Sequence, residues 1–319
     1  MNRPMLNASA GGNRNHPNYE EKAIVGIQAC SEWNLIVDPP IERKRRRRST
    51  SERRTASPWN RQLVMLIVDD SSSMSRNSKA KYATKTAREV VRQCQLKSGK
   101  MACFDVAIFA YGNLIKCSDN HILRPVTEVN ASSIEYHGVS GETKIRMALQ
   151  GAKFLLDGYN EGYYKLHKYP ELVPPPLIFL LSDGYNGDGN PVPDAAAIKE
   201  MDLAIKQAPM LATVGIETGG TKHDVPHELM KRLASKNSNG EPAYFEINDL
   251  NLLVELIATT SSSFINSTDD LIDEANRIRR QWNRPNFGGT KGIEEQGDED
   301  EIDKDIEDED QGDEDESNR

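Results

Sequence analysis

The chain has 319 residues, 37% of them hydrophobic and 28% charged, and a formal net charge of −9 at pH 7. Its four cysteines lack C-x-x-C spacing, which argues against a disulfide scaffold and against a zinc site. No apolar segment reaches the length of a membrane span, and the N-terminus lacks the apolar core of a signal peptide. We therefore expect a soluble, cytoplasmic protein without membrane contact, or a nuclear one if the source is eukaryotic.

Charge is distributed unevenly along the chain. Residues 1–60 contain 11 Lys or Arg and 6 Asp or Glu, whereas residues 294–316 contain 16 acidic residues and one lysine. The segment 61–292 is balanced, with 27 residues of each sign. Segments with high charge and few apolar residues do not fold alone. We therefore expect a basic, largely disordered arm over 1–60, a folded domain over 61–265, a helix over 266–285 and an acidic disordered tail over 286–319.

The arm contains two features of its own. Residues 20–38 include two apolar stretches, which we expect to order as an edge strand or as a short partner-docking peptide. The run Arg43–Arg48 holds six consecutive basic residues, which suit nucleic-acid binding through phosphates, a nuclear-entry signal, or a solvated linker that pairs with the acidic tail. Phosphorylation of the neighbouring hydroxyl residues would lower this charge and act as a switch; they are Ser49, Thr50, Ser51 and Thr55.

Apolar runs alternate with helical spacing through the folded segment. Strands are expected at 63–69, 104–111, 177–182, 211–216 and 243–247. Apolar residues keep helical spacing over 83–94 and 145–156, and further helices are expected at 194–207, 225–235, 248–262 and 268–283. This alternation predicts an α/β fold, with a doubly wound, mostly parallel Rossmann-like sheet that is covered by helices on both faces.

Three oxygen-bearing side chains follow the first strand. Asp69, Ser71 and Ser73 form a D-x-S-x-S pattern directly after the apolar run 63–68. In open α/β sheets, ligands bind at the carboxyl ends of the strands. A carboxylate with two hydroxyls is a hard-oxygen set, which suits Mg²⁺, Mn²⁺ or Ca²⁺ better than zinc. Capping of the helices that follow is the alternative role for Asp69 and for Asp183, which ends a later strand. We favour a divalent-metal site.

Two later segments supply residues for the same site. Thr143 ends the turn 140–143 (Ser-Gly-Glu-Thr), and Asp183 follows the apolar strand 177–182 and precedes a glycine. Over about residues 61–265 the chain resembles the von Willebrand factor A (VWA) family, because it fills all five positions of that family's metal-ion-dependent adhesion site: Asp69, Ser71, Ser73, Thr143 and Asp183. The resemblance implies the VWA fold and a Mg²⁺ ion with one open position, which a Glu or Asp of a protein partner fills.

The chain departs from the common family pattern at Asp70, Ser72 and Glu142, none of which removes a ligand. Successive side chains of a strand point to opposite faces, so Asp70, next to Asp69, is expected to point away from the metal. Glu142 either leaves the site open or fills the open coordination position itself. The acidic tail is a further internal source of carboxylates, because it repeats Gln-Gly-Asp-Glu-Asp-Glu at 296–301 and 311–316; a purely solubilising tail is the alternative.

No catalytic constellation stands out, since the six histidines are scattered and no phosphate-binding loop is present. We expect a protein that is not an enzyme, with no catalytic residues and no organic cofactor. The resemblance implies instead a metal-dependent protein-interaction module. Within residues 104–183, the segments 125–127 (Pro-Val-Thr), 140–143 and 175–184 resemble intracellular bacterial VWA proteins of tellurite-resistance and stress-response operons, which are commonly encoded beside a protein kinase and a PP2C-type phosphatase. This similarity implies an adaptor or regulated target in a phosphorylation-linked stress or defence system.

Two alternatives belong to other functional classes. One is a VWA subunit of a MoxR-like AAA+ ATPase complex, which the same resemblance implies. The other is a nucleic-acid-associated protein that uses Arg43–Arg48 and binds in a salt-dependent, metal-independent manner.

Two segments outside the metal-site motif have an expected location in the fold. The 268–283 helix is amphipathic and is expected to pack on the domain or to offer a surface to a partner. The insert 159–176, rich in Tyr and Pro, is expected on the side of the domain opposite to the metal, where a second interface would form.

Overall fold

The computed structural model describes residues 57–100, 102–116, 123–183, 186–216, 227–247, 250–263 and 265–282. The expectations for the 20–38 segment, for Arg43–Arg48 and for the acidic tail concern residues outside these ranges.

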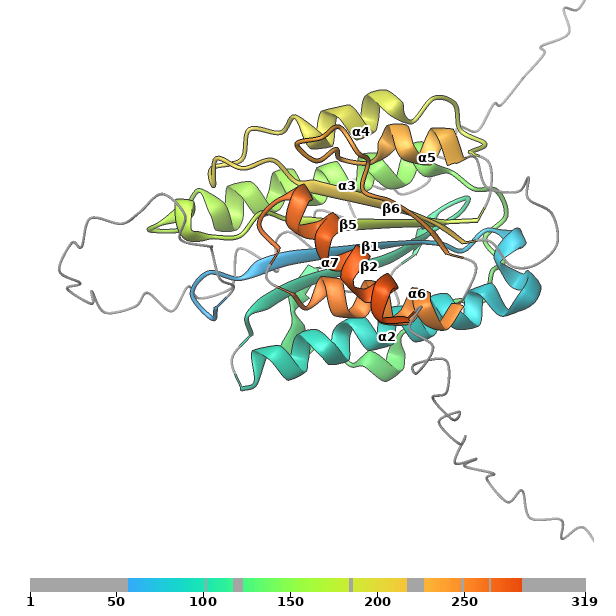
Figure 1. The fold of residues 1–319 in the computed structure, drawn as a ribbon, viewed down its shortest axis with the longest axis horizontal. Coiled ribbons are helices and arrows are strands. Elements are labelled where there is room, and N and C mark those ends of the chain that lie inside the picture. Colours follow the sequence, from blue (N-terminus) through green and yellow to red (C-terminus); the bar gives the residue numbers. More distant parts are fainter. Residues whose placement is uncertain are drawn as a thin grey trace, which may run out of the picture.

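A seven-stranded, mostly parallel sheet forms the centre of the described part of the chain (Figure 1). Its order is β3-β2-β1-β5-β6-β7, with β4 beside β2. The parallel strands are β1 (Gln62–Asp69), β2 (Phe104–Tyr111), β5 (Leu177–Ser182), β6 (Met210–Ile216) and β7 (Tyr244–Ile247). The short strands β3 (Ile115–Lys116) and β4 (Leu123–Pro125) pair antiparallel with β2. The predicted fold class is confirmed. The sequence does not predict β3 and β4, because such short runs carry no periodicity.

Helices cover both faces of the sheet. On one face lie α3 (Ile145–Tyr159), α4 (Val192–Lys199) and α5 (His227–Leu233), and on the other α2 (Lys79–Ser98), α6 (Leu250–Ser261) and α7 (Thr268–Trp282) (Figure 1). Short helical turns complete the connections: η1 (Ser72–Ser78), η2 (Val126–Glu128), η3 (Ala131–Ser133), η4 (Asn160–Tyr164) and η5 (Pro170–Leu172). None of the helices in the described ranges is long and apolar enough to cross a membrane.

Strand β1 shows how the sequence builds this layered arrangement. Its side chains alternate between two cores: Val64, Leu66 and Val68 pack under α2, α6 and α7, and Leu63, Met65 and Ile67 pack under α3, α4 and α5. A strand that is buried on both faces needs such an unbroken apolar run, and burial of each large side chain contributes about 1.5–3 kcal/mol. Because β1 lies between β2 and β5, Asp69 is held at the centre of the carboxyl edge.

The C-terminal helix α7 packs on the domain. Four apolar side chains on one face are buried in the same core as α2 and α6, namely Leu271, Ile272, Ala275 and Ile278. Of the two roles expected for this amphipathic helix, packing on the domain is therefore the one observed.

The predicted helix at 194–207 is wrong in its second half. Helix α4 ends at Lys199. Leu203 and Ile205 are both buried, but they enter the core from a turn in which Lys206 N donates to Leu203 O at 2.8 Å. This turn is also held by a hydrogen bond of 2.9 Å from Ala204 N to Asn160 Oδ1, and Lys206 within it has a φ of 56°.

The insert 159–176 lies at the amino edge of the sheet, as expected for a segment opposite to the metal. Arg61 N, just before β1, donates to the Tyr163 hydroxyl at 3.1 Å. The Tyr159 hydroxyl donates to the buried Asp105 carboxylate at 2.5 Å, and Arg61 Nη1 lies 3.3 Å from the other oxygen of Asp105. Burial raises the pKa of Asp105, while Arg61 and Tyr159 oppose that rise.

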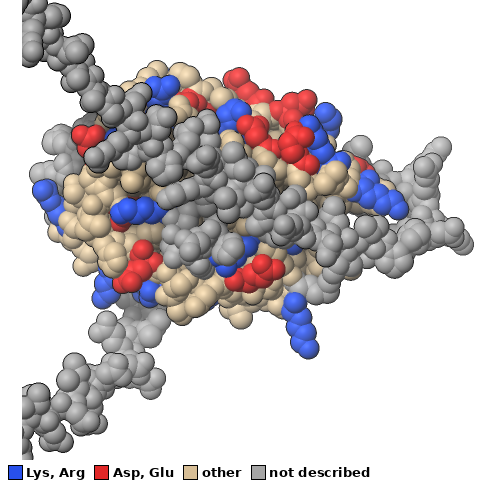
Figure 2. Space-filling model, turned by 180° about the vertical axis from the view of Figure 1, so that it is seen from behind, with Lys and Arg blue, Asp and Glu red and all other residues tan. Residues whose placement is uncertain are grey.

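Charges of both signs are interspersed on the face seen in Figure 2. This pattern agrees with the balance of 27 basic and 27 acidic residues within 61–292. Several acidic residues gather near the upper edge of that view, with Lys and Arg side chains beside them.

Candidate metal centre

Asp69 stands at the carboxyl end of β1 and is fully buried. Its Oδ1 accepts a hydrogen bond of 2.9 Å from Ser71 N, and its Oδ2 accepts one of 2.9 Å from Ser182 Oγ. The first bond turns the chain sharply after the strand, which brings the next hydroxyls back toward the strand end. Ser71 Oγ and Ser73 Oγ lie 3.0 Å apart.

Asp183 reaches the same point from the end of β5, the neighbour of β1. Its Oδ1 accepts a hydrogen bond of 2.7 Å from Ser73 Oγ. Its Oδ2 lies 2.6 Å from Lys79 Nζ at the start of α2. Asp69, Ser71, Ser73 and Asp183 are therefore joined in one hydrogen-bonded group, although 110 positions separate Ser73 from Asp183.

Thr143 is buried and lies in the turn that the chain places against this group. Ser72 N donates to Gly141 O at 3.0 Å, which fixes the turn to η1. Gly187 N donates to Thr143 O at 2.8 Å, and this bond fixes the turn to the loop after Asp183. The structure thus holds Thr143 between the segments that carry Ser73 and Asp183.

The two buried aspartates, Asp69 and Asp183, repel each other when both are charged. Burial raises the pKa of Asp69 to about 6; the nearby Asp183 charge adds to the rise, and hydrogen bonds from Ser71 and Ser182 oppose it. A buried carboxylate whose pKa is raised gains from a bound cation.

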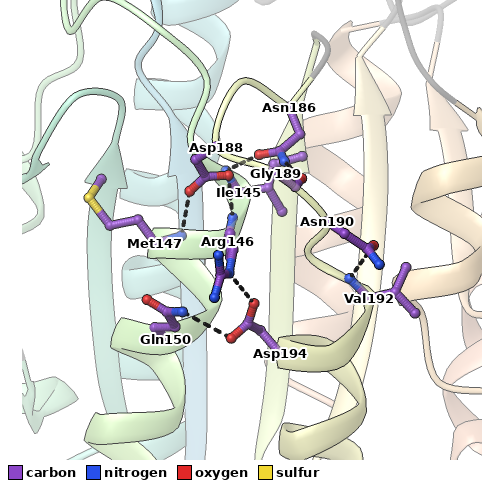
Figure 3. Close-up of polar contacts among 10 residues, drawn as sticks. All are labelled: Ile145, Arg146, Met147, Gln150, Asn186, Asp188, Gly189, Asn190, Val192 and Asp194. Carbon is purple, nitrogen blue, oxygen red and sulfur yellow. Dashed lines mark hydrogen bonds and ion pairs between the residues drawn. The ribbon is translucent and has the colours of Figure 1, made fainter.

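The loop after Asp183 also caps helix α3, a role that the sequence interpretation misses (Figure 3). Ile145 N donates to Asn186 Oδ1 at 2.8 Å, and the Asp188 carboxylate accepts from Arg146 N at 3.1 Å and from Met147 N at 2.8 Å. These are three of the amides that a helix start leaves unpaired. The Asn and Asp in the Gly-rich stretch after Asp183 were the available signal.

Asp70 has a structural role. Its carboxylate accepts hydrogen bonds from His137 N at 3.1 Å, Gly138 N at 2.6 Å and Ser140 Oγ at 2.6 Å. Asp70 therefore faces the 137–140 loop, in agreement with the strand period, and organises the loop that leads to Thr143.

Glu142 is exposed. A Cβ added at Gly187 would lie 3.8 Å from Glu142 Oε2, so this carboxylate lies over the loop that follows Asp183.

The chemistry of the donors fits a hard divalent cation. Within the described residues, no group of three or more His, Cys, Asp or Glu could hold a metal ion, so a metal here depends on hydroxyl ligands together with two carboxylates. The 3.0 Å between Ser71 Oγ and Ser73 Oγ equals the edge of an octahedron around an ion with bonds of about 2.1 Å, the length typical of Mg²⁺. The role of the five residues as metal ligands stays a prediction.

No protein-family model and no curated protein matches the chain. Similar solved structures include von Willebrand factor type A from Catenulispora acidiphila, with 14% identity and a TM-score of 0.47 over 64% of this chain and 43% of that one. The pilus adhesin SpaC from Lactobacillus rhamnosus GG has 10% identity and a TM-score of 0.48, over 69% of this chain and 32% of that one. Manganese-loaded TRAP protein of Plasmodium vivax has 16% identity and a TM-score of 0.41, over 65% and 74%. The chain spans less than half the length of the first two.

Proposed function

We propose that this protein is a metal-dependent protein-interaction module of VWA type. Asp69, Ser71, Ser73, Thr143 and Asp183 would hold Mg²⁺, with Mn²⁺ and Ca²⁺ as the other candidates of the same hard-oxygen class. The observation that carries the proposal is the convergence of two strand-end aspartates with two serine hydroxyls 3.0 Å apart. When bound, the metal would supply a positive centre for a carboxylate of a protein partner.

Binding, rather than catalysis, is the function that the contacts favour. Both oxygens of Asp69 and both oxygens of Asp183 accept hydrogen bonds from chain donors. Such bonds orient carboxylates as ligands, whereas a general base needs a free oxygen within reach of a substrate proton. In this proposal the chain's own residues would hold the ion, and the ion would supply the positive charge that binds the partner's carboxylate.

Calorimetry with Mg²⁺ and Mn²⁺ on the full chain tests the proposal. We expect binding by the natural protein and loss of binding in Asp69→Ala. Asp202→Ala is the matched control, because its side chain is 85% exposed and remote in sequence from the five residues. Absence of binding to the natural protein at millimolar metal would overturn the metal site. A second titration, of the metal-loaded protein with a Glu- or Asp-containing peptide, tests the carboxylate partner.

The finer proposal is that this module serves a phosphorylation-linked stress or defence system, with a protein kinase and a PP2C-type phosphatase as partners. It rests on the motif resemblance within residues 104–183 given under Sequence analysis and on the hydroxyl cluster at Ser49–Ser51 and Thr55. Metal-dependent capture of a kinase or phosphatase from the source organism would support it. Capture of an AAA+ ATPase would favour the MoxR-like alternative, and salt-sensitive nucleic-acid binding that survives EDTA would favour the basic run.

A further inference from the structure

Lys79 places a positive charge inside the candidate metal centre. Its Nζ lies 2.6 Å from Asp183 Oδ2, and the two side chains are 8% and 0% exposed. Lysine side chains are rarely buried unless they are paired. Asp183 is thereby engaged on both sides, because its Oδ1 accepts from Ser73 at 2.7 Å. The ammonium thus sits on a carboxylate that the metal site requires.

The backbone before Lys79 is shaped to deliver this side chain. Asn77 and Ser78 both have left-handed conformations, with φ of 52° and 60°. They are two of the three non-glycine residues with positive φ in the described ranges, and they are adjacent. Left-handed backbone disfavours residues with a Cβ, although Asn tolerates it best. The tight reversal lets Ser73 and Lys79, six positions apart, reach the two oxygens of one carboxylate.

We propose that Lys79 is an internal cation that competes with the divalent metal for Asp183. Without metal, the ammonium neutralises one of the two buried aspartates. When Mg²⁺ or Mn²⁺ binds, the positive charges of the metal and the ammonium repel each other in a poorly solvated volume, so the Lys79–Asp183 contact and metal binding oppose each other. Lys79 thereby sets the metal affinity of the site. This inference rests on the proposed function, because it assumes that the five residues hold a metal.

A purely structural ion pair predicts a different result. A lysine that only ties α2 to β5 would affect folding stability, because removal of one partner from a buried pair leaves an uncompensated charge. Metal affinity would then be unchanged or would fall with the loss of order at Asp183. The sign of the change in metal affinity therefore separates the competing cation from the structural tie.

The experiment measures Mg²⁺ and Mn²⁺ affinity by calorimetry on the full chain. The variants are Lys79→Met, which keeps the length of the apolar stem, and Lys79→Gln, which keeps a hydrogen-bond donor without the charge. Lys81→Met is the matched control, because it removes the same charge from an exposed position of α2 two residues away. Melting temperature in EDTA and in saturating Mg²⁺ is the second readout.

We expect both Lys79 variants to bind metal about tenfold more tightly than the natural protein, which corresponds to about 1.4 kcal/mol. Their melting temperature in EDTA should fall, and the rise on adding Mg²⁺ should exceed that of the natural protein. Lys81→Met should match the natural protein in both readouts.

Equal or weaker metal binding by Lys79→Met and Lys79→Gln, beside clear binding by the natural protein, would overturn the competing role and leave the proposed function intact. Absence of binding in all four proteins would overturn the metal site itself. If Lys79→Met fails to fold in EDTA, Lys79→Gln decides the comparison, because its amide keeps a hydrogen-bond donor at this position.

Discussion

The Asp188 carboxylate pairs with the backbone amide of Met147 at 2.8 Å, so that a loop from beyond β5 caps the first turn of α3 (Figure 3). The helix has no cap of its own, because Lys144 stands at the N-cap position without a side-chain bond. The loop that starts at Asp183 and the helix that starts after Thr143 are therefore one structural unit. Two candidate ligands that lie 40 positions apart in the chain are held together by backbone amides.

Asp188→Ala should lower the free energy of unfolding by about 1 kcal/mol, the usual effect of losing a cap, because two amides at the start of α3 lose their acceptor. Urea unfolding measures the change. Asp202→Ala removes an exposed carboxylate whose partner, Lys206, lies 3.4 Å away at the surface, and it should have an effect near zero. Equal losses in the two variants would contradict the capping role.

Asp70→Ala should lower the free energy of unfolding by about 3 kcal/mol, the upper range for loss of bonds to a buried charged acceptor. Asp70 is 3% exposed and accepts from two backbone amides and the Ser140 hydroxyl, which its removal would leave without an acceptor in the loop before Thr143. Urea unfolding in EDTA gives the value. Ser72→Ala is the control, since that side chain is exposed and its bond to Gly141 O is long, at 3.3 Å. A loss below that of Ser72→Ala would refute this account.

Asp69→Asn changes the neighbour of Asp70 and should raise the free energy of unfolding when metal is absent, whereas Asp70→Ala lowers it. Because the pKa of Asp69 in the folded protein is raised to about 6, the folded state binds more protons than the unfolded state between about pH 4 and pH 6. The free energy of unfolding therefore falls as pH rises through this window, by about 3 kcal/mol at most. Asparagine removes this dependence, so in EDTA at pH 7 the variant should be more stable than the natural protein, while it loses metal binding.

Urea unfolding in EDTA at pH 4, 5, 6 and 7 checks the sign. Asp105 also has a raised pKa, and its contribution is present in both proteins, so the difference between them isolates Asp69. Parallel pH profiles for the natural protein and Asp69→Asn would show that Asp69 is not destabilised by burial.

Local sequence patterns predict the central strands and most of the helices of this protein well. The apolar runs that become β1, β2 and β5 are separated from one another by helical stretches, so their length and continuity are enough to place the sheet. The spacing fails at 200–207, where Leu203 and Ile205 keep an apolar pattern but enter the core from a turn. Contacts between distant segments are beyond local patterns altogether. Lys79 and Asp183 are 104 positions apart, and nothing near Lys79 in the sequence indicates a buried partner.

The close fit between the 137–140 loop and η1 leads to a last prediction. Gly138 has φ of +67°, and a Cβ added there would lie 2.3 Å from Ser75 N and 2.7 Å from Met74 C, both of them backbone atoms. Gly138→Ala therefore combines left-handed strain with a contact that no side-chain rotation relieves, and it should cost about 3 kcal/mol. Gly240 has φ of +82° with nothing within 4 Å of an added Cβ, so Gly240→Ala carries the strain alone and should cost about 1 kcal/mol.

The two glycine variants also separate stability from site geometry. Relief of the clash at Gly138 must displace Met74 and Ser75, next to Ser73, so Gly138→Ala should weaken Mg²⁺ binding as well as folding, whereas Gly240→Ala should weaken folding only. Urea unfolding and Mg²⁺ calorimetry on both variants give the comparison. Unchanged Mg²⁺ affinity in a folded Gly138→Ala protein would mean that the position of η1, and with it the Ser73 hydroxyl, does not limit the metal site.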